Sequence, residues 1–307
     1  MSFDVITIGS AVVDIFIKSD DFLLHPSEMG TLLCQKYGDK VELDYLQLHS
    51  GGGASNTAAG FVKMGFATST ICELGKDMWT QFVVSDLDKA KIDTSLLIKE
   101  RKEQTGGSII MIGEDGGRTV MVHRGASSML NPKDIDDSNL SSCRWVHLTN
   151  IAGQLETLKA IFKTVNDNPT KMSWNPGKAE LEMLISGQLK ISDLPVEIFI
   201  INKEEWQIVE KLKDQLTKKF PMIVVTNGKE GGFVLAQDQE ISYQAEYKKT
   251  IDETGAGDAF CVGFISAYLH HQPLEICLDW GKRNAASVVT YIGAKDGLLS
   301  KREIEIS

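Results

Sequence analysis

Four small or flexible residues, Thr254 to Gly257, stand between an acidic pair and a single carboxylate, Asp258, near the C-terminal end of the chain. An apolar stretch follows, and it predicts a helix from about Asp258 to His270. Small residues before a helix leave backbone N–H groups uncovered, and the helix N-terminus adds partial positive charge. The stretch therefore predicts an anion-binding cradle suited to a phosphate.

Asp258 has two interpretations at this position. A carboxylate in the first turn of a helix ordinarily caps the helix or complements its dipole. Beside a bound phosphoryl group, however, a carboxylate would repel the ligand. Accepting a proton from an attacking hydroxyl would offset that cost.

Short apolar runs alternate with longer segments of helical period along most of the chain. This alternation implies crossover units and a mostly parallel sheet covered on both faces, so the expected fold class is α/β. No Pro- or Gly-rich linker interrupts the chain, and we expect one domain over residues 1–307. Strands are expected at Val5–Ile8, Ser69–Cys72, Trp145–Leu148, Met172–Trp174, Ile198–Ile201 and Met222–Val225. Helices are expected at Asn56–Met64, Trp79–Ala90, Leu155–Asn166, Ala179–Leu189 and Lys203–Lys219.

Polar or glycine-rich clusters follow four of these strands in succession. In an open parallel sheet, ligands bind outside the carboxyl ends of the strands. Asn, Thr and Gly also cap helices and form turns, which would explain any single cluster. Four in a row predict a shared polar cleft. The clusters are Thr149-Asn150, Asn175-Pro176-Gly177, Asn202-Lys203-Glu204-Glu205 and Thr226-Asn227-Gly228.

Two segments, at about 14–50 and 106–126, break the alternation. The second has two β-rich arms around Glu114–Gly117, which is a hairpin signal. The first lacks a long helical pattern. A small antiparallel sheet standing apart from the main sheet would explain both segments, either as a lid over a site or as an ordinary edge hairpin.

Composition excludes several classes of function. The chain has 307 residues and a formal net charge of −10, which argues against a basic nucleic-acid-binding face. No stretch approaches 18 uninterrupted apolar residues, so we expect no membrane contact. The five cysteines are scattered without a CxxC, as in a cytoplasmic protein with reduced thiols. Metal-binding histidine spacings and the GxxxxGK[ST], GxGxxG and GxSxG motifs do not occur.

A series of motifs in order resembles the ribokinase-like carbohydrate kinases, also called the phosphofructokinase-B family. The C-terminal motif departs from the family signature at Glu253, where a small hydroxyl residue or proline is usual. Gly53 stands where ribokinases proper often carry lysine, so the resemblance does not assign ribose. The motifs are GSAVVD at 9–14, GGGASNTAAGFVKMG at 51–65, NPG at 175–177, NKEE at 202–205, TNGKEG at 226–231, DETGAGD at 252–258 and NAASVVTYIGAKDG at 284–297.

The resemblance implies an ATP-dependent phosphotransferase that acts on a primary hydroxyl of a sugar or sugar-like substrate. By matching position, Asp258 would accept the hydroxyl proton, and the N–H groups of Gly255, Ala256 and Gly257 would form an anion hole. Two alternatives stay open: a nucleoside kinase of the same family, and a non-catalytic sugar-binding regulatory protein with this fold.

The resemblance also assigns ligand contacts along the chain, with the small sheet as a lid through which two chains would form a homodimer. The substrate would contact Asp14, Gly51, Gly52, Asn56 and Arg124. The nucleotide would contact Asn175, Asn202, Thr226, Gly228, Gly231 and Asn284. Mg²⁺ would bind through water at Asn202 and Glu205, and a potassium ion would fit the family pattern at Asp252 and Thr254.

Overall fold

The main sheet is mostly parallel. The computed structural model describes residues 3–28, 30–99, 102–115, 117–236 and 239–306. Within these residues, the sheet has eight strands in the order β14 (Gln239–Tyr243), β13 (Gly232–Ala236), β12 (Met222–Thr226), β11 (Val196–Asn202), β10 (Lys171–Trp174), β9 (Trp145–Leu148), β1 (Val5–Ile8) and β6 (Thr68–Ile71). All neighbours from β12 to β6 pair in parallel, whereas β13 and β14 add an antiparallel edge.

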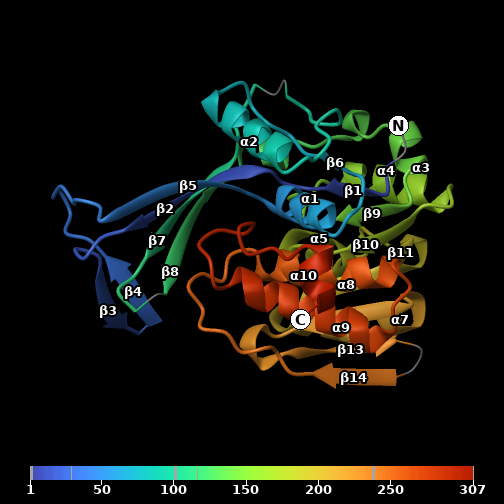
Figure 1. The fold of residues 1–307 in the computed structure, drawn as a ribbon. Helices are drawn as coiled ribbons and strands as arrows, with labels where there is room; N and C mark the ends of the chain where they lie inside the picture. The colour runs from blue at the N-terminus through green and yellow to red at the C-terminus, as the bar shows by residue number, and fades with distance from the viewer. Residues whose placement is uncertain (1–2, 29, 100–101, 116, 237–238, 307) are drawn as a thin grey trace.

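Helices cover both faces of the main sheet, which confirms the expected α/β class (Figure 1). One face packs against α1 (Gly53–Lys63), α8 (Ala256–Leu269), α9 (Leu274–Val288) and α10 (Lys301–Ile306). The other packs against α3 (Asp137–Ser141), α4 (Leu155–Asn166), α5 (Lys178–Ile185), α6 (Lys203–Ile208) and α7 (Lys213–Lys219). Within the described ranges, no helix has the length and apolar character needed to cross a membrane.

The strands read as continuous apolar runs because both of their faces are buried. Successive side chains of a strand point to opposite faces, so Ile200 joins the core beneath α8 while Ile201 joins the core beneath α4 and α5. The α4 helix presents one apolar stripe to the core that it shares with α3, α5, α6 and α7. The 3.6-residue period of its apolar residues predicts such a stripe. That stripe contains Leu158, Ile161, Phe162 and Val165.

The sequence predicted β1, β9 and α4 with their observed bounds. The single helix expected over Lys203–Lys219 is wrong, because a 3₁₀ turn at Glu210–Leu212 separates α6 from α7. The backbone leaves the helical region at Val209, whose side chain is fully buried. Strands β13 and β14 were not predicted, since they pair antiparallel and do not follow the strand–helix alternation.

A small sheet stands apart from the main sheet (Figure 1). Its order is β5 (Tyr45–Gly51), β2 (Val12–Lys18), β7 (Gly107–Ile112) and β8 (Arg118–His123). The predicted hairpin is the antiparallel pair β7–β8, although Gly116 of its turn lies outside the described residues. The sheet is mixed, since β2 pairs with β5 antiparallel and with β7 in parallel. Strands β3 (Leu23–Ser27) and β4 (Gly30–Cys34) form a separate hairpin between β2 and β5.

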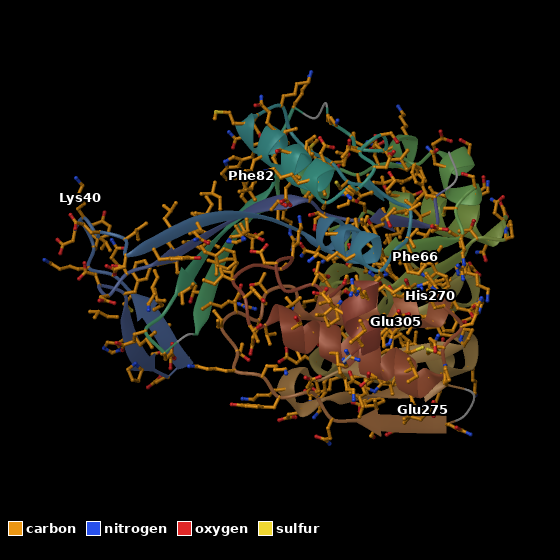
Figure 2. All side chains as sticks on the ribbon, viewed as in Figure 1. Lys40, Phe66, Phe82, His270, Glu275 and Glu305 are labelled. Carbon is orange, nitrogen blue, oxygen red and sulfur yellow. The ribbon has the colours of Figure 1, made fainter. Side chains whose placement is uncertain are left out.

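Helix α8 is held closely against its neighbours along its length. At its C-terminal end, the rings of Phe66 and His270 stack with centroids 4.9 Å apart (Figure 2). In its middle, a Cβ on Gly263 would come within 2.3 Å of the Trp280 carbonyl oxygen, so the glycine permits close approach to α9. The remaining end of α8, its N-terminus, therefore has a fixed position.

Candidate active site

The N-terminus of α8 is shaped by a glycine that no other residue could replace without strain. Gly255, the N-cap, has φ of +79° in the left-handed region. A Cβ at this position would lie 2.3 Å from the Cβ of Ala294, in the loop after α9. The sequence places glycine there because both the backbone conformation and the packing exclude a side chain.

Three backbone N–H groups remain uncovered at this helix end. The N–H of Ala256 donates to the carbonyl oxygen of Glu253 at 3.2 Å, so it is partly engaged in a turn. No carbonyl of the described residues accepts from the N–H of Gly255, Gly257 or Asp258. Two of the three expected donors, Gly255 and Gly257, are thus available, together with the N–H of Asp258.

Asp258 lies beside these donors and is held by Asn56. The Asn56 side-chain amide donates to Oδ2 of Asp258 at 2.8 Å, which joins α1 to α8. Burial raises the pKa of Asp258 to about 6, the Asn56 hydrogen bond opposes this rise, and the charge of Asp14 adds to it. The carboxylate is therefore a stronger proton acceptor than an exposed aspartate. Asn56, predicted to hold substrate, donates to Asp258 through its side-chain NH₂ group, while its buried Oδ1 accepts from no described residue.

Asp14 comes from the small sheet and faces the same region. The Ser108 hydroxyl donates to its Oδ1, and no described residue donates to its Oδ2. That Oδ2 lies so close to Gly51 that an added Cβ would come within 1.9 Å of it. Burial raises the pKa of Asp14, while the Ser108 hydrogen bond and the charge of Lys295 lower it. The free oxygen is thus available to accept a hydrogen bond from a hydroxyl group.

Lys295 is a charged residue of this region that the sequence analysis missed. Its Nζ lies 2.8 Å from Oδ2 of Asp86 in helix α2 (Met78–Lys89), and it also donates to the Ser50 hydroxyl. It lies within the predicted 284–297 motif, but its spacing there gives no sign of a partner more than 200 residues away. Lys295 stabilises the end of β5 next to Gly51, and its positive charge opposes the raised pKa of Asp14.

A cavity of about 320 Å³ connects Asp258 to the carboxyl ends of strands β9 to β12. The four polar clusters predicted from the strand ends meet at this cavity, as expected of the carboxyl edge of a parallel sheet. Its lining residues are Ser10, Gly53, Thr149, Asn150, Asn175, Pro176, Gly177, Ile200, Ile201, Asn202, Glu205, Thr226, Gly257, Asp258 and Cys261.

Some of these lining residues were not predicted, although the sequence contained a signal for most of them. Thr149 and Asn150 directly follow β9 and belong to a polar cluster already noted. Cys261 lies three residues after Asp258, hence on the same face of α8. Ser10 accepts from the Gly53 N–H at 3.1 Å, a contact between segments that no local pattern reveals.

Asn202 and Glu205 form a reciprocal cap at the start of α6. The Glu205 N–H donates to Oδ1 of Asn202 at 2.8 Å, and the Asn202 N–H donates to Oε2 of Glu205 at 2.9 Å. Among the described residues, nothing donates to Oε1 of Glu205, which is therefore free at the cavity wall. Burial raises the pKa of Glu205, so a nearby cation would favour its ionised form.

Three of the six predicted nucleotide contacts do not line the cavity, and the five predicted substrate contacts lie outside its lining as well. Asn284 is a correction: it is fully buried, donates to the Ala259 carbonyl and accepts from the Leu299 N–H, so both ends of its amide are occupied. The other two nucleotide contacts outside the lining are Gly228 and Gly231. Gly231 makes a turn so tight that a Cβ would come within 2.0 Å of a carbonyl oxygen. Among the predicted substrate contacts, Arg124 is exposed.

The predicted potassium ligands are engaged by an arginine, which corrects that assignment. Nη1 of Arg118, from β8, lies 2.6 Å from Oδ1 of Asp252 and 3.1 Å from Oγ1 of Thr254. A cation bound between these two oxygens would occupy the place of the guanidinium. The residues therefore do not fit a monovalent cation while Arg118 is present. Glu253, between them, is exposed to solvent.

The model of the pfkB family of carbohydrate kinases matches residues 2–301. The chain belongs to the pfkB family of carbohydrate kinases. Kinases of this family transfer a phosphoryl group from ATP to a hydroxyl group of a small molecule. The resemblance inferred from the motifs is confirmed, and it covers nearly the whole chain.

Relatives of this pfkB kinase include sugar and nucleoside kinases. A ribokinase of Staphylococcus aureus is 24% identical over 326 residues, covering 99% of this chain and 99% of the relative. A deoxyribokinase of Salmonella typhimurium is 24% identical over 306 residues, covering 95% and 94%. The solved structure of the nucleoside kinase of Methanocaldococcus jannaschii has a TM-score of 0.80 at 24% identity, covering 99% of this chain and 97% of that one. This likeness shows a shared ribokinase fold.

Proposed function

We propose that this kinase transfers the γ-phosphoryl group of ATP to a primary hydroxyl of a sugar-like substrate, with Asp258 as the general base. The supporting observation is the position of Asp258: it stands beside uncovered backbone N–H groups and lines a cavity that Glu205 also lines. A carboxylate in that place repels a bound phosphate and weakens its binding, a cost that is offset if the carboxylate accepts the proton of the attacking hydroxyl. The direct test is phosphoryl transfer by the wild type and by Asp258→Asn.

The reaction needs positioning and charge stabilisation more than covalent chemistry. As the substrate oxygen bonds to phosphorus, its proton passes to Asp258, whose pKa of about 6 keeps it mainly ionised at neutral pH. Asn56 orients the carboxylate by donating to Oδ2. The N–H groups of Gly257 and Asp258 would donate to the transferring phosphoryl group, where negative charge must be stabilised.

The substrate would lie between Asp258 and the small sheet. Oδ2 of Asp14 is free to accept from a hydroxyl, and such buried polar contacts discriminate strongly against molecules that lack the hydroxyl. Gly51 and Gly52 let the backbone approach closely, since an added Cβ would come within 1.9 Å of Oδ2 of Asp14 and 2.5 Å of the Ser10 carbonyl oxygen. The small sheet would act as a lid that excludes water and limits ATP hydrolysis.

A nucleoside substrate is the second candidate. By register, Val120 and Val122 lie on the same face of the small sheet as Asp14, and their side chains are 45% and 63% exposed. An apolar surface next to a hydroxyl-binding carboxylate would suit a ribosyl group that carries a base. Comparison of sugars with nucleosides in the same assay separates the two candidates.

Mg²⁺ would bind near Glu205. Within the described residues, no cluster of three or more His, Cys, Asp or Glu side chains could hold a metal, which suits an ion that keeps several waters and binds through one carboxylate and phosphates. The free Oε1 of Glu205 lies at the cavity wall and fits that role. Glu205 would orient the magnesium-bound waters beside the phosphates, and the ion would neutralise phosphate charge.

The Glu205→Gln variant is expected to need about tenfold more Mg²⁺ for half-maximal turnover. Glutamine can keep the reciprocal cap, so the stability of α6 should change little while the charge is lost. The measurement is ADP release as a function of Mg²⁺ concentration. Glu204→Gln, an exposed neighbour, is the matched control and should leave the Mg²⁺ dependence unchanged. Equal Mg²⁺ dependence in all three proteins would contradict this role.

We also propose a homodimer through the small sheet, with a second copy of this chain as the partner. On the face opposite Asp14, β5, β2, β7 and β8 align Leu48, Ile15, Ile109 and Met121 in one row. Three of these side chains are between 38% and 51% exposed, which is unusual for contiguous apolar residues of a monomer.

Sedimentation velocity is expected to show a particle of twice the chain mass of 33.8 kDa. Met121→Lys should shift it to the monomer, because a buried charge in the interface would be unpaired. Ile306→Lys, an equally drastic change at an exposed site on α10, is the control and should remain dimeric. A wild type that sediments only as a monomer would overturn the dimer.

The five cysteines are all free in the structure. We propose a cytoplasmic location on this basis, since free thiols persist in a reducing compartment.

A further inference from the structure

Arg118 connects the small sheet to the loop that leads into α8. Its Nη1 lies 2.6 Å from Oδ1 of Asp252, a carboxylate whose side chain is only 5% exposed. Arg118 lies at the start of β8, on the face that also carries Asp14. Among the ion pairs of the described residues, this is the only one that joins the small sheet to the loops around α8.

Besides the arginine, Asp252 connects the turn at Thr254 to the loop at Gly293. Its Oδ1 accepts from both the N–H and the hydroxyl of Thr254, at 3.0 and 2.7 Å. Its Oδ2 accepts from the N–H of Gly293 at 2.9 Å. These contacts fix the turn before Gly255 and the loop that packs against it. The direction of the uncovered N–H groups at the α8 N-terminus depends on this arrangement.

The buried Asp252 carboxylate requires a positive partner. An ionised group in such a place is costly unless a charge compensates it, and the other donors to Asp252 are neutral. Arg118 supplies the compensating charge from the small sheet, 134 residues away in the sequence. Movement of the small sheet away from the body would break this pair and leave the carboxylate uncompensated.

We propose that Arg118 is a positioning residue that replaces a bound monovalent cation beside Asp252 and couples the position of the small sheet to the anion cradle. The cradle is formed only when β8 lies against the loop before α8. Phosphoryl transfer by this chain then needs no added potassium. The proposal rests on the role of the α8 N-terminus as the phosphate cradle.

The first test is thermal unfolding at fixed ionic strength in potassium chloride or in tetramethylammonium chloride, whose cation is too large for the site. In Arg118→Ala, potassium should bind at the vacated position and raise Tm by about 2 °C, because a ligand that binds only the folded state stabilises it. The wild type and Thr119→Ala should show no shift. Thr119 is the exposed neighbour on β8 whose side chain points to the opposite face.

Two further variants connect this shift to Asp252 and to turnover. Arg118→Ala with Asp252→Asn should lose the potassium effect, since the carboxylate is gone. In an assay of ADP release with ATP and Mg²⁺, the kcat of Arg118→Ala should be at least about tenfold below that of the wild type in tetramethylammonium chloride. Potassium chloride should restore it. Arg118→Lys should retain most of the wild-type activity without potassium. The proposal is overturned if potassium changes the Tm of Arg118→Ala no more than it changes the Tm of the wild type and the other variants. It is also overturned if turnover by the wild type requires potassium.

Unfolding needs no substrate, so it decides the role of Arg118 even if no phosphoryl transfer is found. Absence of transfer by the wild type would instead remove the proposed function.

Discussion

The Asp258→Asn variant is expected to lose kcat by about 10³-fold while it still binds ATP. Asparagine keeps the size of the side chain and can accept a hydrogen bond from Asn56, so the cavity should retain its shape. It cannot accept the hydroxyl proton. ADP release gives kcat, and calorimetric titration gives ATP affinity. Asp279→Asn, which alters an exposed carboxylate on α9, is the control and should keep full activity.

The same variant should be more stable than the wild type at neutral pH. Burial raises the pKa of Asp258 to about 6, above its ordinary value, so ionising this carboxylate costs folding free energy. The cost begins as the pH rises above the unfolded-state pKa of about 4 and is complete above about 6. The neutral amide avoids that cost. A higher Tm at pH 7, with no gain below about pH 4, would show that this carboxylate is retained for chemistry.

Turnover by the wild type should decrease as the pH falls through about 6, because Asp258 is then protonated and cannot accept the hydroxyl proton. A variant with normal turnover would contradict the assignment of the base.

Alanine substitutions at Gly255 and Gly257, two glycines of one motif, are expected to change the free energy of unfolding in opposite directions. Gly255→Ala should lower the free energy of unfolding by more than about 2 kcal/mol, because alanine is strained at φ of +79° and its Cβ would overlap Ala294. Gly257→Ala should raise it by about 0.5 kcal/mol, because Gly257 is helical and an added Cβ has no atom within 4 Å.

Activity should not follow stability in this pair. The methyl group of Gly257→Ala would stand in the cavity, beside the N–H groups that hold the phosphoryl group, and kcat should fall by about 10²-fold. Urea unfolding and ADP release on the same samples give the two quantities. Gly187→Ala, a substitution at a left-handed turn with open space around it, controls for backbone strain away from the site. A Gly257→Ala enzyme with wild-type kcat would place the phosphate elsewhere.

The fold was largely predictable because local patterns specify it. Buried parallel strands read as apolar runs, and α4 has a clear amphipathic period, so both were found with nearly the right bounds. The strand ends predicted the cleft because the topology of a parallel sheet brings them to one edge. Strands β13 and β14 follow no such alternation and were missed.

The position of the proposed base was predictable because one segment supplies the chemistry. Asp258 and its glycines are contiguous, so their arrangement could be inferred from a helix N-terminus. Arg118 could not be found in this way, because its partner lies 134 residues away on a different element. Asn284 shows the converse: its motif suggested a ligand contact, but tertiary packing uses its amide to connect α8 with the segment before α10.

The most direct measurement of the central claim is transfer of ³²P from [γ-³²P]ATP to a panel of sugars and nucleosides, including ribose, deoxyribose, fructose and adenosine, by the wild type and by Asp258→Asn. We predict a labelled phosphate ester with at least one compound in the wild type, and about 10³-fold less with the variant. A wild type that is stabilised by one of these compounds but labels none of them would contradict the account and indicate a binding protein.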